Sequence, residues 1–539
     1  MRDGFQNRFG WRVAAAALVV ALAPPVMAGI PVDTQLSELD AAPELRVEGG
    51  SLKLTLEEAL SLALERNLGL VVERYRLSES ELAVDQSKGI FDPNLTVALS
   101  STDDTSPSAS NLDGADVQTS TRDVWNFGVS RLISTGGTGS VSFNNSRLET
   151  NSLFASLNPS FSSGLDFNFG QPLLRDQGRE VTRRGIKIAQ TNLGISRENF
   201  ESQVVDILQN VESTYWSLAE ARAQLAVSEE SLALAKQLHD QNRIRVDVGT
   251  LAPLELVQSE AGIATRDEEI IRARGLVGDT EDRLRQLLNL DSPETWSWSI
   301  VPETDPEIEL VEIDVEQSIQ IALAERPELR SKRLDQENRG LDARYFANQQ
   351  KPRLDLNVRY GANGIGGDVR GGENPFTGEI IVPAPGGYSD ALDQITGFDF
   401  DGWTVSLNMG YTIFNSSAKA LRALAETSHD RGEAELNELQ LGVATEVRRL
   451  ARAVDTAAQA RASAAVSRRL AEKNLDAEQK RYDNGMSTSF QVLEIQEDLS
   501  SARSREVTSV ANYHRALLLY YKSIGRLLEE NGVEIVGGP

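Results

Sequence analysis

Residues 481–494 read RYDNGMSTSFQVLE, and residues 245–258 read RVDVGTLAPLELVQ. In each stretch a long helical pattern runs into a glycine, Gly485 or Gly249, and a second helical pattern begins after a few small or turn-forming residues. Glycine is the residue favoured just past the end of a helix. Each stretch therefore predicts a helical hairpin, with its tip turn at Gly485 or Gly249.

The two hairpins are expected to belong to two copies of one unit. Their glycines lie 236 positions apart, and the same offset carries Phe200 onto Leu436 and Leu288 onto Ile524. Self-similarity at a long period predicts internal structural repeats. The expected organisation is a first repeat over 29–290, a linker over 291–314, a second repeat over 315–528 and a loose tail over 529–539. Within the repeats we expect long helices at about 183–248 and 418–483, and returning helices at about 253–290 and 488–528.

Composition excludes several classes of function. The 539 residues include 54 basic and 80 acidic side chains, a formal net charge of −26, which argues against nucleic acid as a partner. The chain has no cysteine, so disulfides and thiol chemistry are excluded. The three histidines, His239, His429 and His514, are widely spaced and none lies near an acidic pair at metal-ligand spacing. We therefore expect no catalytic residues, no metal and no cofactor; the protein is not expected to be an enzyme.

The N-terminal residues have the pattern of a secretory signal. Arg2, Arg8 and Arg12 precede an apolar run over 13–23, and Val26-Met27-Ala28 offers small residues for a signal peptidase. A signal peptide over 1–28 is predicted, followed by an irregular lead-in over 29–52. No later segment reaches the ~20 apolar residues of a membrane helix, so entry into a membrane would have to use strands.

Strict alternation of apolar and polar residues replaces the helical period between the helices of each repeat. It is clearest over 403–411, where Val405, Leu407 and Met409 would share one face. Strands are expected within about 94–172 and 353–413, four by clear pattern and six if weaker segments count, with long polar loops over 101–123 and 361–402. Pattern alone also fits a soluble sandwich, but the signal sequence and the loops favour outer-membrane strands with Val405, Leu407 and Met409 facing lipid.

Oligomerisation follows from the small number of strands. Membrane barrels begin at about eight strands, and an open sheet edge cannot exist in lipid, so several chains must share one barrel. A helix over 183–248 would be about 100 Å long, more than a globular core needs. The expected assembly is a barrel continued by a helical tube.

With these features the chain resembles the TolC family of outer-membrane efflux proteins. The resemblance covers nearly the whole mature chain and rests on two copies, an opening helix, a proline before the strands and a Tyr-x-x-Gly turn. Its residues are Leu56, Ala59, Ala63, Pro93, Pro352, Tyr482, Gly485, Val492, Leu493 and Glu494. The resemblance implies an α+β membrane protein: a homotrimer with one shared transmembrane β-barrel in outer-membrane lipid and a long periplasmic α-helical barrel.

The resemblance also implies a function and a gate. The protein would be a passive outer-membrane duct of a tripartite efflux or type I secretion system, docked to a periplasmic adaptor and an inner-membrane pump. Family members restrict the periplasmic tip with a tyrosine, acidic residues and a basic partner, which implies a gate at Glu255, Tyr482, Gln491 and Glu494. Tyr482 is expected to hydrogen-bond a carboxylate such as Glu255. Gln491 and Ser487 depart from the pattern, because they stand where an acidic and a basic residue could be.

A different class of protein stays open as an alternative. A periplasmic coiled-coil adaptor or tether with a soluble β-domain would share the long helices, but it would not need alternating segments placed between them in both copies. The sequence does not identify the transported substrate, since ducts of this kind take their specificity from the pump.

Overall fold

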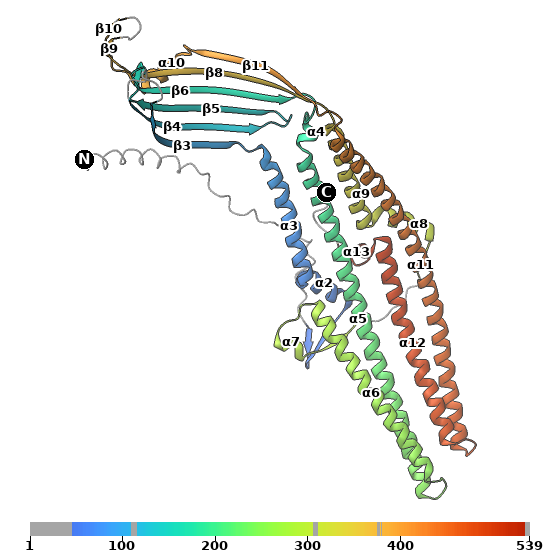
Figure 1. Ribbon diagram of the computed structural model, residues 1–539. Helices are drawn as coiled ribbons and strands as arrows, with labels where there is room; N and C mark the ends of the chain where they lie inside the picture. Colours follow the sequence, from blue (N-terminus) through green and yellow to red (C-terminus); the bar gives the residue numbers. More distant parts are fainter. Residues whose placement is uncertain (1–45, 109–115, 305–310, 374–377, 379, 534–539) are drawn as a thin grey trace, which may run out of the picture. The chain divides into compact units, whose positions relative to one another are not determined.

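A computed structural model describes residues 46–108, 116–304, 311–373, 378 and 380–533 (Figure 1). All of these residues belong to one compact unit, Leu39–Val533. The expected signal peptide and the end of the expected tail lie outside the described residues. Among the helices described, none is long and apolar enough to cross a membrane.

The helices of the first half lie on both sides of its strands. Helix α2 (Leu56–Arg66) begins with a capping box, in which Thr55 and Glu58 satisfy each other's backbone N–H groups. Asn67 ends α2 and caps α3 (Leu68–Lys88) through Gly69 N–H. After the strands come α4 (Arg179–Thr182), α5 (Arg184–Asp247) and α6 (Leu254–Leu287). The bounds of α5 and α6 lie within three residues of those expected from the helical period.

The second half has helices in the same order. They are α8 (Val315–Glu325), α9 (Pro327–Gln349), α11 (Ser416–Asp483) and α12 (Ser489–Ile524), followed by α13 (Leu527–Glu530). Along the chain, α5 and α11 each separate the strands from a hairpin turn. Helix α12 packs against α5 as well as α11, so the two hairpins lie side by side. The expected loose tail is partly wrong, because α13 occupies its first residues and Val533 is buried.

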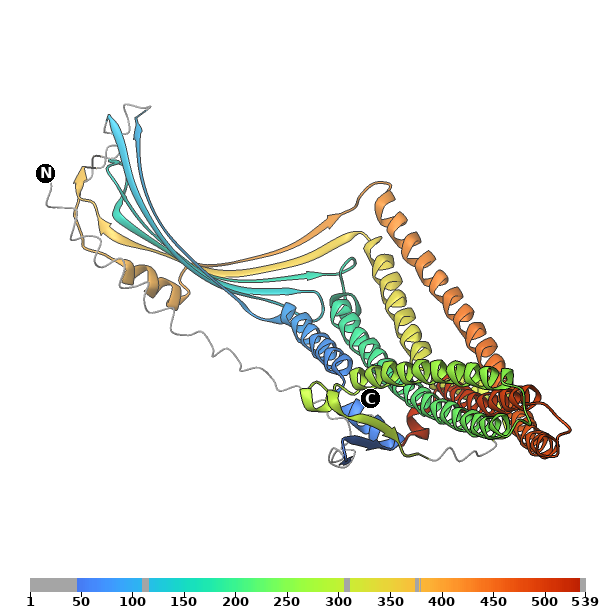
Figure 2. The same ribbon diagram turned by 90° about the horizontal axis from the view of Figure 1, so that it is seen from below.

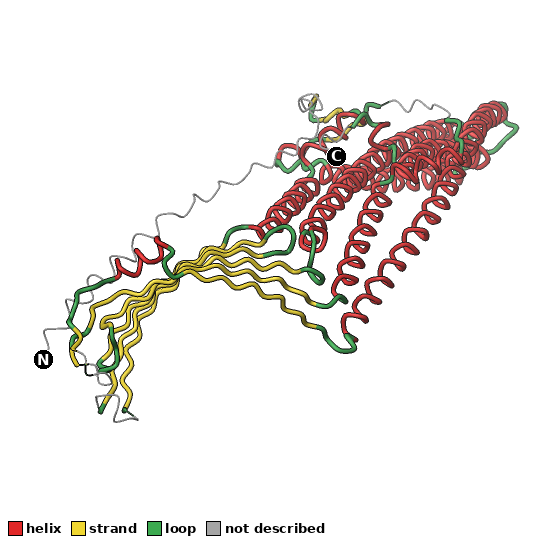
Figure 3. Tube along the Cα trace, turned by 90° about the horizontal axis from the view of Figure 1, so that it is seen from above, coloured by secondary structure: helices red, strands yellow, loops and turns green. Residues whose placement is uncertain are grey.

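Six strands form one antiparallel sheet in the order β11-β8-β6-β5-β4-β3 (Figure 3). Four come from the first half and two from the second. Their bounds are β3 (Asn94–Pro107), β4 (Val117–Leu132), β5 (Thr138–Thr150), β6 (Leu157–Pro172), β8 (Arg353–Val369) and β11 (Asp401–Gly410). Within the described residues β3 and β11 are the outer strands, each paired on one side only.

The register places apolar side chains on one face of this sheet. One row across all six strands runs Leu95, Val129, Val141, Phe167, Tyr360 and Trp403. The neighbouring positions on the opposite face are polar or small, including Thr96, Ser142, Asn168 and Thr404. Since side chains alternate along a strand, the sheet has one apolar face and one polar face.

Helix α10 (Tyr388–Gly397) covers one end of the apolar face, and Figure 2 shows it beside the strand ends. Gly364 and Gly366 make its approach possible, because a Cβ on either would lie 2.0 Å from Ala391 O or 2.2 Å from Gly387 O. Tyr388 donates a hydrogen bond of 2.8 Å to Asn145 and packs edge-on against Trp125. This helix corrects the expected loop over 361–402, whose first residues continue β8.

Two further expectations were wrong. The expected loop over 101–123 is largely strand, since β3 and β4 remain paired as far as Pro107 and Val117. Polar residues occupy both faces there, so the period of two disappears from the sequence while the backbone pairing continues.

The expected lead-in and linker are also ordered in part. Strands β1 (Arg46–Glu48), β2 (Ser51–Leu54) and β7 (Ser299–Pro302) form a small sheet, and α7 (Pro293–Ser297) directly precedes β7. A two-stranded ribbon, β9 (Gly372–Glu373) with β10 (Ile380–Ile381), lies beyond β8.

The main apolar core of the second half lies among α8, α11 and α12. Its buried residues include Val447, Leu450, Tyr513 and Ile524. A separate small cluster lies near the hairpin turns, where Leu238 and Tyr482 meet Val492. Burial of large side chains at that position fixes how the two hairpins pack against each other.

Candidate functional site

The two hairpin turns have the same backbone hydrogen bonds. After α5, Gly249 N donates to Val246 O at 2.9 Å and Thr250 N to Arg245 O at 2.8 Å; after α11, Gly485 N donates to Tyr482 O at 3.1 Å and Met486 N to Arg481 O at 2.9 Å. This is the Schellman arrangement of a helix C-terminus. Gly249 and Gly485 have φ of 73° and 74°, a left-handed conformation in which a Cβ is strained. The glycines singled out from the sequence therefore end the two long helices.

Arg245 joins one hairpin to the other. Its guanidinium lies 4.2 Å from the centre of the Tyr482 ring, donates to Tyr482 O at 3.2 Å and forms an ion pair of 3.3 Å with Asp483. Cation–π contacts of this kind contribute about 0.5–1 kcal/mol at exposed sites. The helix end of α5 is thus attached to the helix end of α11 by one side chain with three contacts.

Tyr482 is buried between the hairpins, with 1% of its surface exposed. Its hydroxyl donates to Asn242 Oδ1 on α5. The expected partner, Glu255, is not the acceptor within the chain, because the Asn242 side chain already meets the hydroxyl. Burial raises the pKa of Tyr482, while the positive charge of Arg245 and its hydrogen bond act in the opposite direction. The phenol is therefore neutral at physiological pH and acts as a hydrogen-bond donor.

Glu255 and Gln491 occupy corresponding positions in the first turns of α6 and α12. Glu255 is half-buried and accepts a hydrogen bond from Ser489 of the other hairpin. Gln491 is exposed and accepts from Ser487 at 2.8 Å within its own hairpin. Glu494, also expected at the gate, is exposed on α12. The structure thus brings Glu255 and Tyr482 into the contact between hairpins, whereas Gln491 and Glu494 lie beside it.

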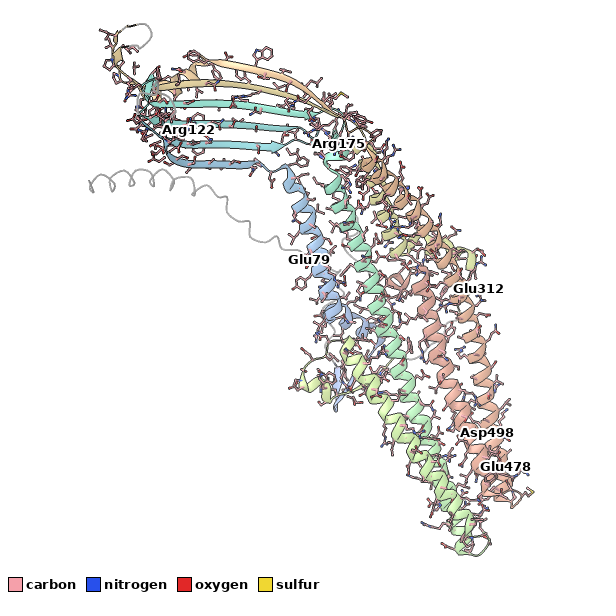
Figure 4. All side chains as sticks on the ribbon, viewed as in Figure 1. Glu79, Arg122, Arg175, Glu312, Glu478 and Asp498 are labelled. Carbon is pink, nitrogen blue, oxygen red and sulfur yellow. The ribbon has the colours of Figure 1, made fainter. Side chains whose placement is uncertain are left out.

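The second tip has a carboxylate of its own that the sequence reasoning missed. Glu478 accepts hydrogen bonds from Ser487 and, at 2.8 Å, from Arg481 Nη1. Figure 4 labels Glu478 close to the hairpin end of α11. Asn242, Arg245 and Ser489 were also missed. The 236-residue offset places Asn242 on Glu478 and Arg245 on Arg481, so aligning the two copies around their glycines would have drawn attention to three of the four missed residues.

Next to the tips, α5, α11 and α12 line a polar groove of about 460 Å³. Four carboxylates, Glu230, Glu472, Asp476 and Asp483, contribute to its lining, together with Arg503. Arg503 pairs with Glu230 at 2.6 Å and with Glu472 at 3.3 Å. The groove between the hairpins therefore has an acidic excess.

At the sheet, the three residues predicted to face lipid are exposed. Val405, Leu407 and Met409 are 55%, 61% and 70% exposed and lie on the apolar face, opposite Val358, Leu356 and Leu354 of β8. The polar residues between them, Thr404, Ser406 and Asn408, project from the other face. An exposed apolar face of this extent is unusual for a protein surrounded only by water.

The sequence model of a protein family described as outer membrane efflux protein matches residues 137–290 and 318–526. The chain belongs to this family. A search of curated proteins found no match. The family match begins just before β5 and ends at α12, so it includes both hairpins but not β3 and β4.

Solved structures of outer-membrane channels have the same fold. VceC of Vibrio cholerae has a TM-score of 0.61 at 15% identity, and the comparison covers 87% of this chain and 96% of that one. CmeC of Campylobacter jejuni has a TM-score of 0.62 at 16% identity, covering 90% and 87%. The open state of MtrE of Neisseria gonorrhoeae has a TM-score of 0.58 at 13% identity, covering 92% and 98%. At these identities the likeness shows the fold alone.

Membership of the outer membrane efflux protein family settles the class of function. The protein is an outer-membrane duct for efflux, similar to TolC. The resemblance inferred from the doubled turns is confirmed. The alternative of a periplasmic adaptor or tether is wrong, because the matched family is one of outer-membrane efflux proteins.

Proposed function

We propose that three copies of this efflux protein assemble into one duct, with a shared transmembrane β-barrel and a continuous periplasmic α-helical barrel. The observation that carries this proposal is the sheet, which has an apolar face that is exposed outside the end covered by α10 and two outer strands paired on one side only. Unpaired backbone groups at a lipid-exposed edge cost several kcal/mol each. Further copies of the same sheet supply the missing partners.

The apolar face forms the lipid-contacting surface of that barrel. Trp403 and Tyr411 flank Val405, Leu407 and Met409, and a separation of eight residues corresponds to about 27 Å along a strand. At a strand tilt of 35–45° this length spans a height of about 19–22 Å, close to the apolar band of about 25 Å between the aromatic girdles of an outer-membrane barrel. The polar face lines an aqueous lumen.

Transport through the duct is passive, and the chain performs no catalysis and needs no cofactor. The two repeats of each chain contribute one hairpin each to a periplasmic mouth. That mouth docks on an adaptor, which connects it to an inner-membrane pump of a tripartite efflux or type I secretion system. This part of the proposal is supported by family membership and by the pairing of the two hairpins in each chain.

The mouth is closed by contacts between hairpins. The hydrogen bond from Tyr482 to Asn242, the Ser489–Glu255 pair and the Arg245 contacts hold one seam together, as described above. Glu255 and Glu494, repeated around a threefold axis, would give the mouth a negative potential that favours cations. The adaptor opens the duct by separating the hairpins.

Native mass measurement in detergent tests the assembly. We expect a trimer that retains its β signal in circular dichroism. Extraction should require detergent, since carbonate would remove a peripheral protein. A folded monomer as the stable species would contradict the shared barrel.

Single-channel recording in planar bilayers tests the gate. Tyr482→Phe combined with Glu255→Gln removes two contacts between hairpins and should raise conductance. Glu494→Gln should leave conductance near the wild-type value and lower the preference for cations. If the double variant conducts like wild type and Glu494→Gln does not alter selectivity, the constriction lies elsewhere.

A further inference from the structure

The outer strands of the sheet are suited to pair with each other across two copies. Counting along the sheet, six antiparallel strands place β3 and β11 in opposite directions. A β11 edge next to the β3 edge of another copy therefore continues the antiparallel pattern without interruption. An odd number of strands would have forced a parallel pair at that position.

The side chains at the two edges also match. Leu95, Val97 and Leu99 of β3 are 62%, 39% and 59% exposed on the apolar face. Residues 405, 407 and 409 of β11 continue the same face, as described above. Thr96 and Ala98 of β3, like Thr404 and Ser406 of β11, lie on the polar face. Pairing the edges would therefore continue both the apolar and the polar surface around the barrel.

We propose that β3 of one copy pairs with β11 of the next, closing a barrel of eighteen strands from three six-stranded sheets. This inference rests on the trimer proposed above and deepens it. The first half contributes four strands to each sheet and the second half two, so the additional hairpin of the first half widens the barrel.

Barrel geometry restricts the register of the seam. Within one chain Leu95 and Trp403 share a row. Strand tilts of 35–45° require the neighbour's Leu95 to lie about six or eight residues further along β11, since an odd shift would exchange the two faces. A shift of about six sets Gly410, the last residue of β11, opposite Asn94, the first residue of β3. Leu407 then faces Val97; with a shift of about eight it faces Leu99.

The proposed barrel is wide. Eighteen strands spaced ~4.8 Å apart with this tilt enclose a backbone diameter of about 34–39 Å. Barrels of 16–18 strands leave an open aqueous channel. The membrane-spanning part would therefore not limit the size of the cargo, and discrimination by size would be left to the helical mouth.

Engineered cysteines test the seam without background, because the natural chain has none. The double variants Leu407→Cys with Val97→Cys and Leu407→Cys with Leu99→Cys represent the two registers. Each would be treated in outer membranes with oxidant or with a short bis-thiol reagent. Covalent dimers and trimers are expected for one of the two pairs. The matched control is Leu407→Cys with Ala98→Cys, whose thiols lie on opposite faces.

The outcomes separate the seam from the assembly. Crosslinked trimers from one register, with little product from the control, support the seam. Native trimers that crosslink in neither register, or that crosslink best in the control, overturn the seam and leave the trimer intact. A monomer in native mass measurement overturns the proposed assembly itself.

Discussion

The two halves of the chain have closely similar helices and different numbers of strands. Helices α2 and α8 both have 11 residues, α3 and α9 have 21 and 23, α5 and α11 have 64 and 68, and α6 and α12 have 34 and 36. The strands number four in the first half and two in the second. Helix length is thus constrained much more strongly than strand number.

A physical reason for this difference lies at the hairpin tips. Contacts such as Arg245 with Tyr482 form only if both long helices reach the same level, so an insertion in either would separate them. An additional antiparallel pair of strands, by contrast, leaves the direction of the outer strands unchanged. The sheet therefore tolerates an additional hairpin, whereas a long helix does not tolerate an additional turn.

The tips differ in chemistry although their backbones agree. The 236-residue offset pairs Asn242 with Glu478 and Glu255 with Gln491, so each tip has one carboxylate and one amide in exchanged positions. In the first tip both groups bond to the other hairpin. In the second tip both groups bond to Ser487, within their own hairpin. The amide and the carboxylate of the first tip therefore contact the second hairpin, whereas those of the second tip contact only their own hairpin.

The largest effect is expected at the sheet, where both halves share one apolar face. Leu407→Arg places a charge in the proposed lipid band and should cost about 2–4 kcal/mol per chain at the bilayer midplane. Yield of trimer in outer membrane should fall strongly. Thr404→Arg is the matched control on the polar face of the same strand and should assemble. Equal assembly of both variants would show that the faces are assigned wrongly.

A smaller effect, on the stability of the folded protein, is expected at one position of α5 that is half-buried while the corresponding position of α11 is exposed. Glu212 of α5 corresponds to Arg448 of α11, which is exposed and pairs with Glu316 at 2.6 Å. Burial raises the pKa of Glu212 to about 7 from 4.5. Because this carboxyl is harder to ionise in the folded protein, it costs stability as pH rises from about 4.5 to about 7. The full cost above that range is on the order of 3 kcal/mol.

Glu212→Gln should therefore raise the thermal unfolding temperature in detergent at pH 8 and have little effect at pH 4. Arg448→Gln is the control at the corresponding position. Its exposed ion pair contributes at most about 1 kcal/mol, so its effect should be small and should not follow the same pH range. A pH-independent effect of Glu212→Gln would show that Glu212 is ionised in the folded state.

Much of the fold could be predicted from the sequence because it depends on local signals. Gly249 and Gly485 mark the turns through their left-handed conformation, and the period of the long helices sets α5 and α11 to within two residues at every end. Strand ends were predicted poorly, since β3 beyond Ser100 is polar on both faces. The partner of Tyr482 was not predicted either, because Asn242 lies 240 positions away and the contact between two long helices is not encoded in local sequence.

The smallest effect is expected at the tips, where the same helix position has different partners in the two halves. Arg245 and Arg481 both lie three residues before the residue that caps their helix, but Arg245 contacts the other hairpin while Arg481 contacts Glu478 and Met486 of its own. Arg245→Ala removes a cation–π contact, a hydrogen bond and an exposed ion pair, together about 1–2 kcal/mol. In planar bilayers this should raise the open-to-closed ratio about five- to thirty-fold.

Two further variants serve as controls. Arg481→Ala should leave the open-to-closed ratio near the wild-type value. Arg245→Lys should give a ratio between those of wild type and Arg245→Ala, because it keeps the charge but loses the planar stacking. Equal effects of the two alanine variants would mean that Arg481 also stabilises the closed mouth, and the different roles of the two arginines would then have to be abandoned.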